Sequence, residues 1–313
     1  MKNKVILTKD NIKILVVCHK LCELPPNSDE LFLPIQVGCA VNDFDLGLQR
    51  DDVINGTLCD NISTKNNSFC ELTALYWAWK NIKKNYPNLE YIGLNHYRRY
   101  FSFNKRNFFS DDIILPENEI RNYKLDKVKL EKILSKNDIL ISKPHVFEYS
   151  LEVEYSVKQI SEDLRTLKRI IHEKYSEYDQ DVYEVLTCNN KLSCCNMTIM
   201  KWNDFNSYCT WLFNILFAAE KEINITNYNE VQKRIFGYMA ERLLNVWIHH
   251  NLKKIKQLNI IKYNNEDYLS QNKKNVKLKN FLKFCKRKLS AKIFLAFKRP
   301  YSKEYYRILN KFN

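Results

Sequence analysis

The 313-residue sequence is 45% hydrophobic and 13% aromatic, enough to form the core of one large α/β domain or two small ones. Its five glycines and seven prolines exclude a fibrous or loop-rich protein. The ten cysteines include no Cys-x-x-Cys pair, so we expect reduced cytosolic thiols rather than a zinc site or a disulfide scaffold. No apolar run reaches the roughly 18 residues of a membrane span, and Ile14–Cys18 is too short for a signal peptide.

The net charge of +14 is concentrated toward the C-terminal end. Residues 273–313 hold fourteen Lys and Arg against one acidic residue, Glu304, so residues 1–272 carry only +1. Between residues 278 and 297, apolar positions recur at helical spacing and are interrupted by lysines. This pattern is typical of an amphipathic helix on an anionic membrane surface. A solvated helix or a partner-binding segment is the alternative.

Short apolar runs separated by helical segments predict an alternation of strands and helices. Strands are expected at Ile12–Cys18, Leu33–Val41, Glu90–Asn95, Asp138–Ser142 and Asn196–Met200. Helices are expected at Ser68–Asn85, Asp126–Leu134, Leu151–Tyr175, Trp202–Ile223 and Val231–Asn251. This alternation favours an α/β fold with a mostly parallel central sheet flanked by helices. Acidic residues almost vanish near Tyr268–Lys273, so we predict a folded domain at 1–268 and a basic helical tail at 269–313.

A polar loop precedes the first of these helices. Ser68 and Glu71 have the spacing of a capping box, which predicts that the helix begins at Ser68. The loop before it offers the hydrogen-bonding side chains of Asp60, Asn61, Ser63 and Lys65. Because a helix N-terminus presents unpaired N–H groups and a positive dipole, we expect this loop to bind phosphate or sugar oxygens. For Glu71 two interpretations stay open, the cap alone or a contact with the sugar.

A second polar cluster follows the expected strand at Tyr91–Leu94. It consists of Asn95, His96, Tyr97, Arg98 and Arg99. Ligands of open α/β sheets bind outside the carboxyl ends of strands, and two arginines with a histidine at such an end suit a diphosphate. The alternative is that the two arginines are surface charges and that His96 is a hydrogen-bonded core residue.

The segments at these positions belong to a longer series of different motifs along the chain. They are Asp60–Ser63, Glu71–Asn81, Tyr91–Phe101, Asn196–Lys201, Tyr208–Phe213 and Arg234–Leu244. Together, over roughly residues 12–250, they closely resemble a bacterial family of surface-polysaccharide synthesis proteins, domain-of-unknown-function family 4422. The resemblance implies a glycosyltransferase of capsule, O-antigen or exopolysaccharide synthesis with a Rossmann-like GT-A fold.

The resemblance also implies the substrates. The donor is expected to be a nucleotide sugar such as a UDP-sugar, carrying galactofuranose or another hexose. The acceptor is expected to be a growing, lipid-linked glycan, which suits a cytoplasmic enzyme that is peripheral at the inner face of the cell membrane. The basic segment 273–313 would then contact anionic lipid.

The expected GT-A strand end departs from the usual pattern of that fold. GT-A enzymes commonly hold a divalent cation with Asp-x-Asp, which neutralises charge on the leaving nucleotide. Here the strand ends in Asn-His-Tyr-Arg-Arg, so we expect His96 with Arg98 or Arg99 to support the leaving group without a required metal. Dependence on Mn or Mg is the alternative. Asp43 and Asp45 form a literal Asp-x-Asp, but they lie outside the motifs and also fit an ordinary polar loop.

Three other positions have both a functional and an ordinary interpretation. His19 ends the first expected strand and either contacts substrate or bonds to a neighbouring loop. Glu241 is a candidate base for the acceptor hydroxyl, or else an ion-pair partner of Arg242 or another basic side chain. His249 and His250 are adjacent on a helix, so they point in different directions and suit one metal ion poorly.

Two other classes of function compete with the transferase. One is a non-catalytic polysaccharide-assembly protein, and the other is a nucleic-acid-binding protein that uses its basic charge. Residues 1–272 are nearly neutral and contain no recognisable nucleic-acid motif, so specific nucleic-acid binding is not expected.

Overall fold

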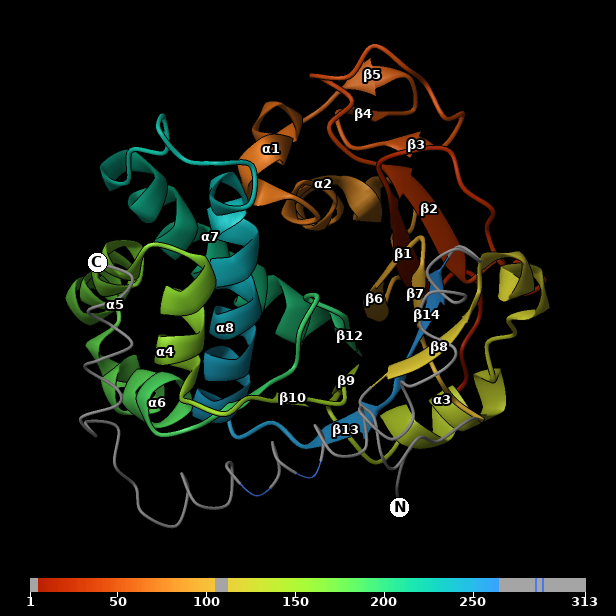
Figure 1. The fold of residues 1–313 in the computed structure, drawn as a ribbon. Helices are drawn as coiled ribbons and strands as arrows, with labels where there is room; N and C mark the ends of the chain where they lie inside the picture. The colour runs from red at the N-terminus through yellow and green to blue at the C-terminus, as the bar shows by residue number, and fades with distance from the viewer. Residues whose placement is uncertain (1–4, 105–111, 265–284, 286–288, 290–313) are drawn as a thin grey trace. The chain divides into compact units, whose positions relative to one another are not determined.

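The computed structural model describes residues 5–104 and 112–264, together with Cys285 and Leu289 (Figure 1). Its contacts divide the chain into two compact units. The first comprises Met1–Lys143, Met197–Cys209 and Lys253–Lys277, and the second comprises Pro144–Asn196, Thr210–Leu252 and Leu278–Asn313. Each unit combines segments that are distant in sequence, which the sequence patterns did not indicate. The predicted boundary at 268, and the tail at 269–313 apart from the exposed Cys285 and Leu289, lie outside the described residues.

A mixed and mostly parallel sheet forms the centre of the first unit. Its main path runs β13-β9-β12-β6-β1-β2-β3. These strands are β1 (Ile12–Cys18), β2 (Phe32–Gln36), β3 (Gln49–Arg50), β6 (Tyr91–His96), β9 (Ile139–Ser142), β12 (Thr198–Lys201) and β13 (Ile255–Leu258). Strand β12 is antiparallel to both of its neighbours, and every other pairing on this path is parallel. The predicted α/β fold with a mostly parallel sheet is confirmed.

Shorter elements extend and flank this sheet. Strand β7 (Arg99–Phe101) pairs with β6 and β14 (Ile260–Asn264), and β14 also pairs with β8 (Asp112–Pro116). Strands β4 (Val53–Ile54) and β5 (Thr57–Leu58) form a separate hairpin. The flanking helices are η1 (Ser63–Lys65), α1 (Asn66–Phe69), α2 (Leu72–Asn81), η2 (Ile82–Lys84), η3 (Glu117–Asn122) and α3 (Lys127–Leu134). Helix α7 (Trp202–Glu222) begins in this unit and ends in the second.

All seven residues of β1 are buried, as expected for a central parallel strand whose two faces are both covered. The observed bounds of β1 match the prediction. The ends of β6, β9 and β12 each differ from their predicted ends by no more than two residues. Strand β2 ends at Gln36, earlier than the predicted Val41. The chain turns there because Gly38 adopts a φ of +71° and the Asp51 carboxylate accepts hydrogen bonds from the N–H groups of Gly38 and Cys39.

The helix predicted at Ser68–Asn85 is interrupted near its beginning. Cys70 adopts a φ of +53°, so the chain forms α1 and then α2 rather than one continuous helix. The predicted capping box is wrong: Ser68 lies inside α1, where its hydroxyl donates to the carbonyl of Lys65 at 3.3 Å. Glu71 stands at the N-cap of α2 but makes no side-chain capping hydrogen bond. The loop at Asp60–Lys65 therefore leads into η1 and α1, not into a helix that begins at Ser68.

The second unit is mainly helical. Its elements are β10 (His145–Val146), α4 (Leu151–Lys158), α5 (Ser161–Lys174), η4 (Ser176–Tyr178), α6 (Asp179–Val182), η5 (Tyr183–Thr187), β11 (Lys191–Leu192), the end of α7, η6 (Gln232–Arg234) and α8 (Ile235–His250). A single helix at Leu151–Tyr175 was predicted, but the backbone of Gln159 is extended and separates α4 from α5. The side chain of Gln159 donates to the carbonyl of Val231 at 3.2 Å, which holds this break in place.

Two polar clusters stabilise the second unit. Arg242 on α8 forms a buried ion pair with Glu154 on α4, with side-chain exposures of 3% and 10%. In the other cluster, Asp181 accepts hydrogen bonds from both His249 and His250, at 2.6 and 2.8 Å. Burial raises the pKa of Asp181, but the two histidines outweigh burial and leave that pKa below its usual value. Adjacent helical residues were expected to point in different directions, but both histidines reach the same carboxylate.

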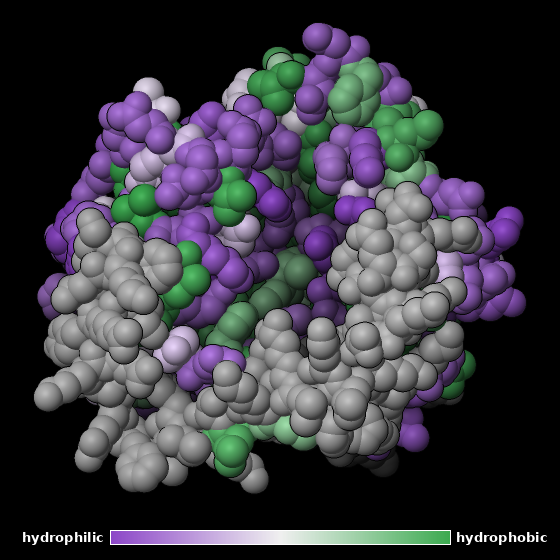
Figure 2. Space-filling model, in the orientation of Figure 1, coloured by the Kyte–Doolittle hydropathy of each residue, from purple (hydrophilic) through white to green (hydrophobic). Residues whose placement is uncertain are grey.

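The described surface seen in Figure 2 is mostly hydrophilic. Leu58 of the β4–β5 hairpin is an exposed apolar side chain, and Val41 and Phe44 are exposed in the loop after β2. Exposed apolar residues of this kind are normal on a folded protein. Among the described residues, no helix is both long enough and apolar enough to cross a membrane.

Candidate functional site

The carboxyl ends of β1 and β6 lie side by side in the first unit. The two strands are parallel neighbours, with Val17 opposite His96. The N–H of Tyr97 donates to the carbonyl of Val17 at 3.0 Å, so the pairing continues past the end of β6. The residues that follow both strands therefore meet at one edge of the sheet, where open α/β sheets bind their ligands.

Tyr97 is the centre of a basic cluster at this edge. Its ring meets the ring of His19 edge-on, with 5.1 Å between the centroids. The guanidinium carbon of Arg98 lies 4.9 Å from the ring centroid of Tyr97, and the ammonium of Lys20 lies 5.8 Å from it. We call Tyr97, His19, Lys20 and Arg98 the Tyr97 cluster. Both cations are within the range of cation–π attraction, so the buried ring holds positive charge at the strand ends.

Two buried polar groups beside this cluster have no hydrogen-bond partner in the described part of the chain. They are the Oδ1 of Asn95 and the hydroxyl of Tyr97, on residues that are 1% and 4% exposed. Burial raises the pKa of Tyr97, while Arg98 and Arg99 oppose that rise. The phenol therefore stays protonated at neutral pH and is able to donate. Buried polar groups of folded proteins are nearly always satisfied, so these two atoms fit a site that a ligand completes.

Arg98 and Arg99 lie in different environments. Tyr97 and Arg98 form the tight turn between β6 and β7, and the N–H of Tyr263 donates to the carbonyl of Arg98 at 2.9 Å. Arg99 is the first residue of β7 and lies opposite Lys262 of β14. Both guanidinium groups act on the pKa of Tyr97, but Arg98 is the one stacked against its ring.

A pair of thiols adjoins the cluster. The sulfur atoms of Cys18, at the end of β1, and Cys22 are 3.9 Å apart. The Cys18 thiol lowers the pKa of Cys22, and the charges of Lys20 and Arg98 act in the same direction against the effect of burial. Sequence reasoning missed Lys20 and Cys22, although Lys20 directly follows His19 at a strand end.

The loop residues Asp60, Asn61 and Ser63 lie apart from this cluster in their hydrogen bonding. The buried Ser63 hydroxyl donates to Asp51 at 2.6 Å, and the side chain of Asn61 accepts from the N–H of Ser63 at 3.0 Å. Asp60 accepts from the hydroxyl of Tyr76 at 3.0 Å. These hydrogen bonds fix the conformation of the loop. Lys65 ends η1, close to the ring of Phe69, and Glu71 is half-buried before α2.

One group of residues in the described chain brings three possible metal ligands together, namely Cys39, Asp51 and Asp52. Asp51 already accepts from two main-chain N–H groups and from Ser63, and Asp52 is paired with Arg50 at 2.7 Å. Burial raises the pKa of the Cys39 thiol to about 12, so it is protonated at neutral pH. A cation would have to displace these donors, and the group is better explained as a polar core that shapes the end of β2.

The Asp-x-Asp at Asp43 and Asp45 lies on an exposed loop after β2. Asp45 accepts from the N–H of Gly47 at 2.8 Å, which closes its own turn. These two carboxylates thus match the alternative of an ordinary polar loop.

Glu241 belongs to the second unit, on α8. Its carboxylate accepts from the N–H of Cys195 at 2.6 Å. Cys195 and Asn196 both adopt positive φ, +70° and +52°, so Glu241 stabilises a turn that costs conformational energy. Its neighbour Arg242, one of the ion-pair partners considered for Glu241, pairs with Glu154.

Comparison with known proteins identifies the family of this chain. A family model described as a domain of unknown function, DUF4422, matches residues 13–253. The chain belongs to the DUF4422 family. A search of curated proteins found no significant match.

Among solved structures, the chain is similar to the apo structure of the WbbM bifunctional glycosyltransferase, with 28% identity and a TM-score of 0.70. The match covers 82% of this chain and 46% of the other, so this DUF4422 chain spans about half the length of its structural relative. This similarity, with the mixed sheet and its flanking helices, shows an α/β fold of the GT-A type. The predicted family and fold are both confirmed.

Proposed function

We propose that this protein is a glycosyltransferase that binds the diphosphate of a nucleotide-sugar donor at the Tyr97 cluster. The observation that carries this proposal is the placement of His19, Lys20 and Arg98 around one buried ring at the carboxyl ends of β1 and β6. Similarity to a bifunctional glycosyltransferase supports the reaction class. A UDP-sugar is the expected donor, and a lipid-linked glycan of a surface polysaccharide is the expected acceptor.

In the proposed reaction, the bond between the anomeric carbon and the diphosphate oxygen breaks. The electron pair leaves with the nucleoside diphosphate, and the acceptor hydroxyl oxygen forms the new bond to carbon while losing its proton to a base. Negative charge develops on the leaving oxygen, where the positive charges of Arg98 and Lys20 stabilise it. His96, or His19 when protonated, would add a further donor. The buried Asn95 and Tyr97 groups would hydrogen-bond the sugar or phosphate oxygens.

Donor binding can be tested by saturation-transfer NMR with a panel of nucleotide sugars, followed by transfer assays with the donor that binds. We expect Arg98→Gln to weaken donor binding and to lower kcat. The matched control Arg165→Gln, which changes an exposed arginine of α5, should change neither. No nucleotide-sugar binding in the unaltered protein would refute the proposal, and binding without transfer to any acceptor would favour a non-catalytic assembly role.

We also propose that transfer does not require a divalent cation. The positive side chains of the Tyr97 cluster occupy the strand end at which a GT-A enzyme commonly presents carboxylates. Transfer in excess EDTA should equal transfer in Mn²⁺ or Mg²⁺. Loss of activity in EDTA with recovery on adding Mn²⁺ would show that a metal is needed.

The basic segment at residues 273–313 is proposed to hold the enzyme at an anionic membrane surface, on the cytoplasmic side. Its fourteen basic residues against one acidic residue support this proposal. The full chain should sediment with vesicles that contain anionic lipid, and a chain ending at residue 272 should not. Equal sedimentation of both chains would refute it.

A further inference from the structure

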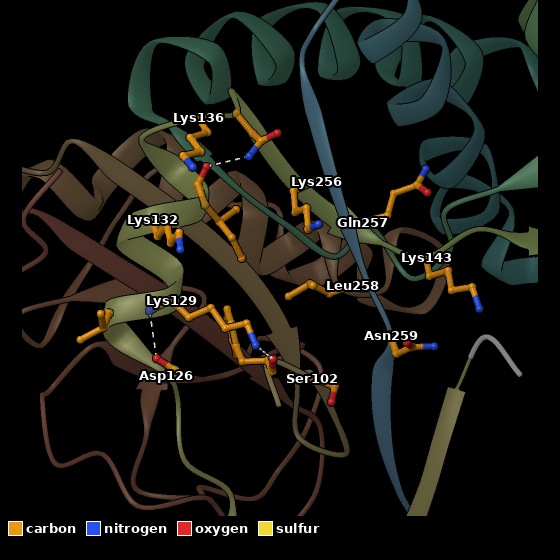
Figure 3. A pocket seen from close by; sticks show the side chains of 14 residues that line it. Ser102, Asp126, Lys129, Lys132, Lys136, Lys143, Lys256, Gln257, Leu258 and Asn259 are labelled. Atoms are coloured by element: carbon orange, nitrogen blue, oxygen red, sulfur yellow. Dashed lines mark hydrogen bonds between the residues drawn. The ribbon is translucent and has the colours of Figure 1, made fainter. Parts of the chain in front are cut away.

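The first unit contains a pocket that shares no residue with the Tyr97 cluster. It is a pocket of about 690 Å³ between helix α3 and strand β13. The residues after β7 and Lys143 after β9 complete its lining (Figure 3). This volume lies within the usual range of pockets that hold small ligands.

The pocket concentrates positive charge. Five lysines line it, Lys129, Lys132, Lys136, Lys143 and Lys256, against one acidic residue, Asp126. The Asp126 carboxylate already accepts from the N–H of Lys129 at 2.9 Å, as the N-cap of α3. The pocket therefore carries a net charge of about +4, although residues 1–272 as a whole carry only +1.

Three of these lysines belong to α3 or to the turn after it. Lys129 and Lys132 are three residues apart in α3 and therefore lie on one face of that helix, and Lys136 lies in the turn that follows its last residue, Leu134. Lys256 comes from the opposite wall on β13 (Figure 3). Like charges at this spacing repel each other, and an anion between the walls would relieve that repulsion, which solvent weakens at the exposed Lys132 and Lys136.

Most of this charge is not neutralised by the described protein. Lys132, Lys136 and Lys256 form no ion pair with any described residue, whereas Lys253 and Lys262 of the same unit pair with Asp204 and Asp112 at 2.8 and 2.6 Å. Lys129 is engaged differently, since its ammonium donates to the carbonyl of Phe103. Three ammonium groups are thus available to a ligand.

The lysines reach the pocket from separate segments of the chain. Lys136 precedes β9 and Lys143 follows it, and Lys256 belongs to β13. Ammonium groups on separate segments suit an anion with more than one phosphate better than a single phosphate. Polar side chains of Ser102 and Asn137 and apolar ones of Val128 and Leu258 also line the pocket. Lysine ammonium groups are good point-charge ligands for phosphate oxygens.

We propose that the α3–β13 pocket binds the diphosphate of a glycan carrier, separately from the donor diphosphate. A lipid-linked acceptor and a soluble diphosphate offer the same chemistry to the lysines. They differ in the hydrocarbon chain beyond the phosphates. The identification as an acceptor site rests on the proposed transferase function, but anion binding by the pocket does not.

The test measures binding of inorganic pyrophosphate by calorimetry at low ionic strength. It compares the full-length protein with Arg98→Gln, which disables the Tyr97 cluster, and with the triple variant Lys132→Gln/Lys136→Gln/Lys256→Gln. The control triple Lys174→Gln/Lys191→Gln/Lys201→Gln removes the same charge from exposed positions outside the pocket. A soluble short-chain prenyl pyrophosphate, tested in parallel, distinguishes a lipid-linked ligand from a free diphosphate.

We expect the Arg98→Gln protein to keep one pyrophosphate site, and the pocket triple to weaken that site roughly tenfold or more. The control triple should stay within about twofold of the unaltered protein. Tighter binding of the prenyl pyrophosphate than of pyrophosphate, lost in the pocket triple, supports the carrier assignment. Equal effects of the two triples, or loss of all pyrophosphate binding in Arg98→Gln, would overturn the pocket site. Failure of transfer in every assay, with pocket binding intact, would refute the proposed function alone.

Discussion

The buried ion pair between Arg242 and Glu154 gives a quantitative test of how the second unit is held together. We consider Arg242→Met, which keeps much of the side-chain volume but removes the charge. Removing one partner of a buried pair costs about 3–5 kcal/mol, because the other charge stays buried and uncompensated. Glu154 retains Lys158 at 2.6 Å, but that lysine is 55% exposed and compensates only partly. We therefore expect a loss near the lower limit, about 3 kcal/mol.

Arg242 makes other contacts whose loss would also destabilise the second unit. Its guanidinium lies 4.8 Å from the ring centroid of Tyr155 and donates to the carbonyl of Tyr238 at 3.0 Å. Cation–π contacts of desolvated groups contribute about 1–2 kcal/mol. Arg242→Met loses this contribution as well. We therefore expect the free energy of unfolding to fall by no less than about 3 kcal/mol.

Hydrogen exchange followed by mass spectrometry suits this measurement, because two compact units need not unfold in one step. Amides of α4 and α8 should exchange roughly 100-fold faster in Arg242→Met, since 1.36 kcal/mol corresponds to a factor of ten. Peptides of β1 in the first unit serve as the internal control. The double variant Glu154→Leu/Arg242→Met should recover most of the protection, because no charge is then left buried. A double variant as unstable as the single one would refute the electrostatic reasoning and leave lost packing as the cause.

Three further predictions follow from other contacts. Glu241→Gln should abolish transfer while leaving donor binding unchanged, if Glu241 is the base, because a glutamine still accepts the main-chain hydrogen bond that holds the neighbouring turn but takes no proton. Cys22 should react with iodoacetamide faster than Cys18, since its pKa is lowered whereas that of Cys18 is raised by its neighbour and by burial. Asp181 should stabilise the fold at pH values above its unfolded pKa, near 3.8, and that contribution should be lost as the pH falls through the lower folded pKa.

Each has a decisive measurement. Transfer by Glu241→Gln at the normal rate would show that the carboxylate serves only the turn. Equal loss of transfer in Glu241→Ala and Glu241→Gln would indicate a role in proton transfer, whereas loss in Glu241→Ala alone would indicate a role in positioning. Peptide mapping after brief alkylation ranks the two thiols, and equal labelling would contradict the assigned pKa order. Urea titrations between pH 3 and 7 should show a smaller pH dependence for Asp181→Asn, and an unchanged dependence would mean that the two histidines do not stabilise that carboxylate.

Much of the first unit was predictable because its central strands have unmistakable patterns. Ile12–Cys18 is apolar throughout, apart from Lys13, and the strand forms there residue for residue. The polar cluster after Tyr91–Leu94 was placed correctly at a strand end, since the change from apolar to polar residues marks the sheet edge.

Other features depended on contacts that no local pattern contains. The turn at Cys70 requires a backbone conformation that is rare for a residue with a side chain, so the helix was predicted to run through it. The Tyr97 cluster requires the pairing of β1 with β6 to bring Lys20 beside the turn after β6. The α3–β13 pocket joins lysines more than a hundred positions apart, each of which appears in the sequence as an ordinary surface charge.

The strand order has a consequence for how this chain is made. Strand β12 sits between β6 and β9 in the centre of the sheet, yet it follows the 144–196 segment of the second unit. A ribosome thus releases β1, β2, β6 and β9 well before the strand that joins β6 to β9 exists, and β13 emerges later still. During that interval the edges of β6 and β9 are open to pairing with other chains. Protection by chaperones, or early folding of the helical segment, would matter most in the interval between synthesis of residues 142 and 198.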